Sequence, residues 1–158
     1  MNPTYSGKRI STELIANHLY SPSYVSMSSA LSWYGLIPER VYLTQSVTIK
    51  HSRKFENTFG KFEYFGVSRD YFSIGIRQEK SESASFIIAT PEKALCDLIY
   101  ATAGINLRYK REAQAFLEED IRLDMEDFQN FDVSILLECA KAGKKTRSLE
   151  TIIKLLNK

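Results

Sequence analysis

The sequence predicts an α+β fold, in which a small antiparallel or mixed sheet of four to five strands is flanked by N-terminal helices and a C-terminal helical segment. Three observations predict it. Apolar residues recur at helical spacing in residues 11–35, β-branched and aromatic residues dominate residues 41–89, and helical spacing returns over residues 90–157. The links between the expected strands are too short for helical crossovers, which favours antiparallel or mixed pairing.

Two helices are expected before the strands. The first runs from Thr12 to Leu19, with Ser11 or Thr12 as N-cap and apolar side chains recurring on one face. The second lies in the serine-rich segment YVSMSSALSWYGLIPE (residues 24–39), with Ser26 as N-cap, because serine hydroxyls can pair the free N–H groups of a first helical turn. Gly35 suits the left-handed residue after a helix, and Pro38 prevents continuation. The serines therefore indicate a helix start and a solvent-facing side, not a catalytic nucleophile.

Residues 41–89 supply the expected strands. One strand lies in VYLTQSVTI (41–49), and two more come from FSIGIR (72–77) and SASFIIA (83–89). A hairpin turning near Gly60 is expected in RKFENTFGKFEYFGV (53–67), with Phe62 and Tyr64 on one face of the sheet. Phe65 and Val67 are expected on the other face or in a continuation past Gly66.

A helix is predicted with unusual clarity at TPEKALCDLIYATAG (90–104). Thr90 suits the N-cap, Pro91 the first helical position and Gly104 the stop. Further helical segments are expected at about 109–120, 133–142 and 146–157, with a short turn near 125–131. The chain is therefore expected to form one domain over 1–158, with a motif-bearing α/β part (1–104) and a helical C-terminal part (105–158).

Composition narrows the class of protein. The chain has 158 residues, 44% of them hydrophobic, and a net charge of +2, which is too small to argue for nucleic-acid binding by itself. No apolar run is long enough to span a membrane, and the N-terminus lacks the apolar stretch of a signal peptide. Cys96 and Cys139 lie in apolar helical contexts and are expected to be buried free thiols, which suits a cytoplasmic protein.

The usual catalytic motifs are absent from the sequence. It has no glycine-rich phosphate loop and no GxSxG, and its two histidines do not make a zinc site. A group of acidic residues is interpreted as a solvated face because its order does not fit a calcium loop: Glu118, Glu119, Asp120, Asp124, Glu126 and Asp127. We therefore expect no enzyme, no cofactor and no metal site. An active site assembled from distant residues is the one enzymatic alternative.

The hairpin is the stretch most typical of a binding surface. Its cations are Lys50, Arg53, Lys54 and Lys61, and they alternate with Phe55, Phe59, Phe62 and Tyr64. Bases stack on exposed aromatic rings flanked by cations, so the stretch could bind nucleic acid. The alternative is a strand pair with its rings in the core and its charges on a solvated edge. A second basic group, Lys144, Lys145 and Arg147, follows the expected end of a helix, where cations are favoured without any ligand.

Two blocks of the sequence carry a family resemblance. They are PSYVSMSSALSWYGLIPE (Pro22 to Glu39) and ATPEKALCDL (Ala89 to Leu98), separated by a β-rich middle. In this order they resemble the AbiEi-type antitoxins of the AbiE abortive-infection system, which belong to type IV toxin–antitoxin pairs. The resemblance runs from about Ser11 to Tyr100, over half of the chain.

The resemblance implies a cytoplasmic, non-enzymatic protein. Its functional partner would be a nucleotidyltransferase-like toxin, which it opposes without forming a stable complex. Members of the family typically carry an N-terminal winged helix-turn-helix for autorepression. Only ten residues precede Ser11, fewer than a winged helix needs. Either the sequence is shortened, or DNA binding is lost or sits on another chain, so repression is not expected to carry over.

Overall fold

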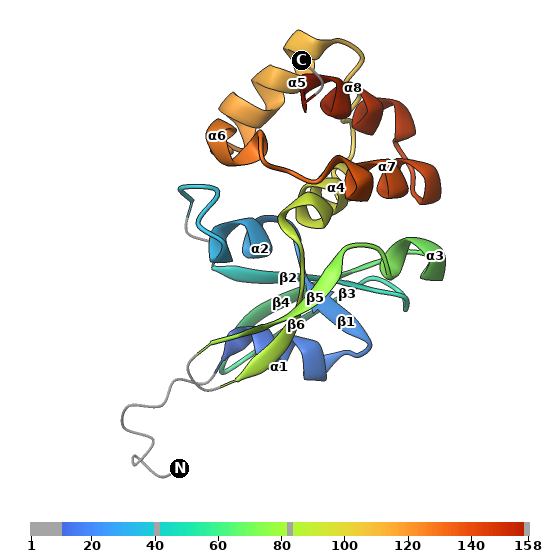
Figure 1. The fold of residues 1–158 in the computed structure, drawn as a ribbon. Coiled ribbons are helices and arrows are strands. Elements are labelled where there is room, and N and C mark those ends of the chain that lie inside the picture. Colours follow the sequence, from blue (N-terminus) through green and yellow to red (C-terminus); the bar gives the residue numbers. More distant parts are fainter. Residues whose placement is uncertain (1–10, 40–41, 82–83, 157–158) are drawn as a thin grey trace.

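The computed structural model describes residues 11–39, 42–81 and 84–156, and it has the predicted α+β architecture (Figure 1). The strands are β1 (Ser23–Val25), β2 (Leu43–Thr48), β3 (Arg53–Asn57), β4 (Gly60–Gly66), β5 (Ile76–Lys80) and β6 (Ser85–Ala89). The helices are α1 (Thr12–Leu19), α2 (Met27–Trp33), α3 (Arg69–Phe72), α4 (Pro91–Ala101), α5 (Lys110–Ala115), α6 (Met125–Phe128), α7 (Val133–Ala142) and α8 (Thr146–Leu156). A π-helical turn, Phe116–Asp120, continues α5.

The six strands form one mixed sheet in the order β3-β4-β2-β1-β6-β5. β2 pairs with β4 and β1 with β6 in parallel, and the other neighbours are antiparallel. Mixed pairing is as predicted, but the sheet has one strand more than the upper expectation. The extra strand is β1, whose three residues are all buried and too few to show alternation. The short helix α3 was also not predicted, and it moves the start of the next strand to Ile76.

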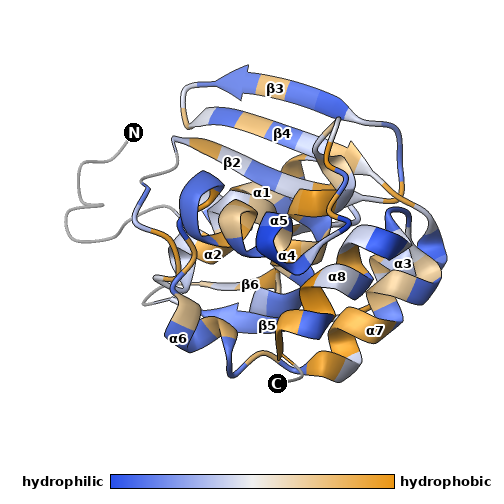
Figure 2. Ribbon diagram, turned by 90° about the horizontal axis from the view of Figure 1, so that it is seen from above, coloured by the Kyte–Doolittle hydropathy of each residue, from blue (hydrophilic) through white to orange (hydrophobic). Residues whose placement is uncertain are grey.

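Helices cover both faces of the sheet. α1 lies over β1, β2 and β6, whereas α2 and α4 cover the opposite face, and α7 and α8 pack on α4 as a further layer (Figure 1). β3 lies at the rim of the molecule and is largely hydrophilic (Figure 2). None of the described helices has the length and apolar character that a bilayer crossing requires.

Local chemistry explains most helix starts. The Ser11 hydroxyl accepts a hydrogen bond from the Leu14 N–H at 3.1 Å, and Thr90 does the same for Lys93 at 3.2 Å. Gly35 follows α2 with a left-handed φ of 77°, as predicted.

The serines of α2 correct the prediction. Ser26 occupies the N-cap position but makes no capping bond, because its buried hydroxyl is turned to another partner. Ser29 donates to the Leu43 carbonyl at 3.0 Å and accepts from the Gln45 N–H at 2.9 Å. These side chains therefore tie α2 to the sheet instead of capping the helix or facing solvent.

Candidate functional site

The two sequence blocks meet in the core of the protein. Ser26 and Tyr24 donate hydrogen bonds from their hydroxyls to Oδ2 of Asp97, at 2.5 and 2.9 Å. Tyr34 donates to the Ala89 carbonyl at 2.7 Å. Segments that are more than 50 residues apart in the sequence thus form one packing unit, held by polar contacts as well as apolar ones.

Lys93 lies one helical turn before Asp97 on α4 and is completely buried. Its Nζ donates to the carbonyls of Tyr71 at 2.7 Å, Phe72 at 3.2 Å and Ile74 at 2.6 Å. A lysine ammonium has three protons, so each has an acceptor. These carbonyls lie at the end of α3, and Lys93 therefore fixes α3 against α4.

We define the polar cluster as the residues around this buried pair: Tyr24, Ser26, Tyr71, Lys93 and Asp97. Burial disfavours the charged forms of Lys93 and Asp97. Burial raises the pKa of Asp97, and the charge of Lys93 counteracts that rise. Burial lowers the pKa of Lys93, which Asp97 counteracts. Burial, followed by the charge of Asp97, raises the pKa of Tyr24 and of Tyr71 well above the ordinary value. The buried acid and base thus oppose the effect of burial on each other's pKa, although burial has the larger effect on both.

One contact in the polar cluster is incomplete. The Tyr71 hydroxyl is near enough to Asp97 to lower its pKa, yet neither Tyr71 Oη nor Asp97 Oδ1 makes a hydrogen bond among the described residues. All five members of the cluster are buried, and the hollows beside the hairpin and beside α1 are lined by other side chains. The cluster therefore joins β1 and α3 to α4 in the core.

The structure divides the predicted basic hairpin between two faces of the sheet. Side chains alternate along a strand, and Arg53 pairs with Tyr64 while Lys54 pairs with Glu63. Arg53 therefore lies on the face that carries α1, whereas Lys54 and Lys61 lie on the opposite face. The four predicted cations do not form one surface.

On the α1 face, the cations already lie over aromatic rings. The Arg53 guanidinium is 4.7 Å from the centroid of the Phe55 ring, and Lys50 Nζ is 5.1 Å from that of Tyr20. Phe62 and Tyr64 are buried. Because these rings are used in packing, the geometry favours the core-and-edge interpretation of the hairpin over base stacking.

The Phe59 ring, at the hairpin turn, is the exception among the predicted rings, because it is 50% exposed.

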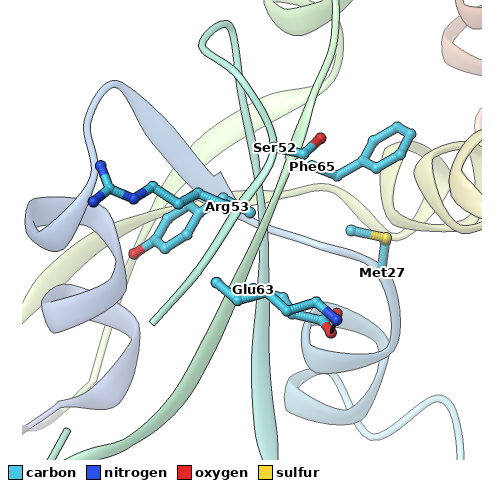
Figure 3. Close-up of a pocket in the computed structure, with 7 residues that line it drawn as sticks. Met27, Ser52, Arg53, Glu63 and Phe65 are labelled. Carbon is cyan, nitrogen blue, oxygen red and sulfur yellow. Dashed lines mark ion pairs between the residues drawn. The ribbon is translucent and has the colours of Figure 1, made fainter. Parts of the chain in front are cut away.

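On the opposite face, the charges of the hairpin are balanced. Lys54 Nζ lies 3.5 Å from a Glu63 carboxylate oxygen, and Lys61 stands opposite Glu56 in the strand register. A hollow of about 370 Å³ opens here between the hairpin and α2. Figure 3 shows Met27, Phe65 and Glu63 around it, while the Arg53 guanidinium points away. The hollow has little net charge available for a ligand, since Lys54 and Glu63 pair with each other.

The second basic group lies at the turn between α7 and α8. Lys144 and Arg147 are exposed. Lys145 donates from Nζ to the carbonyl of Thr102, the residue that ends α4. A cation at a helix C-terminus was predicted here, but it serves α4 and not the preceding helix.

The sequence analysis missed the polar cluster itself. Lys93 and Asp97 are spaced i, i+4, which is the spacing of an ordinary surface ion pair on a helix. The available indication was their setting, since nearly every neighbour on the first turns of α4 is apolar or small. A charged pair inside such a helix points to a buried partner, which here comes from β1 and α3.

Other predicted groups are where they were expected. Cys96 and Cys139 are buried free thiols. The acidic residues of 118–127 are exposed, and Asp124 caps α6 through the Glu126 and Asp127 N–H groups. Within the described ranges, no three His, Cys, Asp or Glu side chains are grouped so that they could hold a metal ion.

No family model matches the chain, and no curated protein sequence matches it significantly.

Proposed function

We propose that this chain is an antitoxin-domain protein that counteracts a nucleotidyltransferase-like toxin in a type IV abortive-infection system. One observation carries the proposal. Tyr24 and Ser26, from the first block of the resemblance, bind Asp97 of the second block in the core. Two blocks that resemble one family and also complete each other's polar contacts are best explained as parts of a single inherited domain.

The proposed activity is non-catalytic and cytoplasmic. The buried acid and base of the polar cluster, Asp97 and Lys93, are enclosed in the core, which supports a role in the fold. The resemblance implies that the antitoxin opposes the effect of the toxin without a stable complex. The antitoxin effect would then depend on the exposed surface of the domain, and the polar cluster would stabilise the fold that presents this surface.

A growth assay tests the proposal. The toxin gene adjacent to this one is induced alone, then together with the full 158-residue chain. We expect the chain to restore growth, and we expect Lys93→Met, which disrupts the polar cluster, to lose rescue through loss of folded protein. A toxin that arrests growth equally in the presence of soluble, folded wild-type chain would contradict the proposal.

Nucleic-acid binding is the second candidate function. It rests on Lys50 and Arg53, which are exposed on the α1 face and form no ion pair with a carboxylate among the described residues. These cations would contact phosphates, so binding would weaken as salt rises. A gel-shift titration at low salt tests it with single- and double-stranded DNA and RNA. Binding should weaken in Lys50→Ala and Arg53→Ala but persist in Lys61→Ala; absence of any shift would end this candidate.

A further inference from the structure

β3 is an edge strand whose outer side pairs with no described strand. The N-terminal helices pack mainly on the inner strands, since α1 lies over β1, β2 and β6, and α2 lies over β2 and β6. An open strand edge is a template for a further strand, and the identity of that strand depends on which groups the edge presents.

Two hydrogen bonds fix the direction of the backbone groups in β4. The Val67 N–H donates to the Thr48 carbonyl at 2.8 Å, toward β2, and the Gly66 N–H donates to Ser52 Oγ at 3.0 Å, toward the β3 side. Successive residues of a strand turn their backbone groups to opposite edges. The even-numbered residues of β4 therefore face β3.

The register then settles which residues of β3 face outward. The even-numbered residues of β4 pair with Arg53, Phe55 and Asn57, whose backbone groups are consequently used within the hairpin. Lys54 and Glu56 turn their N–H and C=O groups to the open edge. Their side chains carry opposite charges and lie on the same face.

We propose that two copies of this chain pair through β3, antiparallel, about a two-fold axis at Phe55. This register places Lys54 opposite the partner's Glu56, twice, with four backbone hydrogen bonds. The neighbouring registers that also match outward-facing residues place Lys54 opposite Lys54, or Glu56 opposite Glu56. Like charges directly opposite each other are destabilising, so charge selects one register.

Both faces of the joined sheet agree with this register. On one face, charges alternate across four strands, from Lys61 and Glu56 to the partner's Lys54 and the partner's Glu63. On the other face, Phe55 meets its own copy, and its ring already packs 5.6 Å from Tyr20. The central pair is not hydrogen-bonded, which is the kind of pair that brings side chains closest.

The other edge of the sheet lacks this complementarity. The Ser81 N–H donates to the Ala84 carbonyl and the Thr90 N–H to the Gly75 carbonyl, so the odd-numbered residues of β5 face β6. Ile76, Gln78 and Lys80 are left to face outward, without any pair of opposite charges. Association through β3 is therefore isologous and closes at two copies.

Analytical ultracentrifugation of the full chain tests the proposal. We expect a monomer–dimer equilibrium in the wild type. Glu56→Lys places lysines opposite lysines, and Lys54→Glu places glutamates opposite glutamates, so each variant alone should dimerise at least about tenfold more weakly. An equimolar mixture of the two variants restores opposite charges across the interface, and we expect it to form a heterodimer.

Lys80→Glu is the matched control, because it makes the same change of charge on the other edge and should leave the dimer intact. Circular dichroism and thermal unfolding establish that each variant is folded. Recovery of the dimer in the mixture cannot come from misfolding of either chain. A wild type that stays monomeric at its highest soluble concentration, or a dimer that both single variants retain, overturns the proposal.

Discussion

Lys93 and Lys54 are two lysines with opposite circumstances. Lys93 is fully buried in the polar cluster, and its three protons bind three carbonyls of the same chain. Lys54 has a side chain that is 82% exposed, and it forms one 3.5 Å ion pair with Glu63. The difference shows that desolvation determines whether a charged side chain serves the fold or can bind a partner. A buried charge is committed to the fold, whereas an exposed one stays available to a partner.

The same substitution at both lysines gives the largest expected contrast. Lys93→Met leaves three carbonyls without their donor and Asp97 without a compensating charge, so we expect a loss of about 3–5 kcal/mol in the free energy of unfolding. Lys54→Met should change it by no more than about 0.5 kcal/mol, since it alters an exposed pair. Urea denaturation followed by circular dichroism measures both. Equal effects at the two sites would break the comparison.

Two tyrosines of the polar cluster allow a finer comparison between a hydroxyl that is hydrogen-bonded and one that is not. Tyr24 donates to Asp97 at 2.9 Å, and hydrogen bonds to a buried charge contribute about 1.5–3 kcal/mol, so Tyr24→Phe should destabilise by about that amount. The Tyr71 hydroxyl makes no hydrogen bond among the described residues. Tyr71→Phe should therefore have the smaller effect in the same denaturation experiment, and the reverse order would show that Tyr71 is the main donor to Asp97.

One hairpin residue is expected to behave as a core residue. A Cβ added at Gly66 would lie 2.3 Å from the Lys50 carbonyl oxygen, so the backbone must shift. Gly66→Ala should cost about 1–3 kcal/mol, the usual range for overpacking. Lys61, an exposed residue near the other end of β4, provides the control, because Lys61→Ala removes side-chain atoms without any clash and should be nearly neutral. A neutral Gly66→Ala in thermal unfolding would mean that the connection carrying Lys50 moves away from β4 at little cost.

The fold was predictable where the information is local. Hydroxyl caps at Ser11 and Thr90 and the glycine after α2 give the helix bounds to within a residue or two, because a cap depends on its immediate neighbours. β1 escaped prediction because three residues cannot show a period. Its pairing with β2 and β6 depends on contacts between segments far apart in the sequence.

The polar cluster was not predictable in the same way. The spacing of Lys93 and Asp97 describes a helix surface equally well, and the difference lies in acceptors and donors about 20 to 70 residues away. The division of the hairpin cations was within reach. Strand alternation, which placed Phe62 and Tyr64 correctly, also separates Arg53 from Lys54 once the pairing of β3 with β4 is known.

The smallest expected effect is a pH dependence that belongs to Asp97 alone. Burial raises the pKa of Asp97 above its ordinary value of 3.8, even though Lys93 and the hydroxyl groups of Ser26, Tyr71 and Tyr24 favour the charged form. Between the unfolded and the folded pKa, the native state therefore binds more protons than the unfolded state. The contribution of Asp97 to the free energy of unfolding is full below the unfolded pKa and declines as pH rises through the folded pKa.

Glu112 and Asp132 act in the opposite sense, because hydrogen bonds lower their pKa values and their contribution is lost as pH falls. Glu112 and Asp132 are unchanged in Asp97→Asn, so their contributions cancel in a comparison with the wild type. The variant no longer titrates at position 97, but its amide oxygen can still accept hydrogen bonds from Tyr24 and Ser26. The difference in unfolding free energy between wild type and Asp97→Asn should therefore shrink as pH rises from about 4 toward about 7. Urea midpoints at stepped pH measure it. A difference that grows with pH would mean that the polar cluster stabilises the Asp97 carboxylate more than water does.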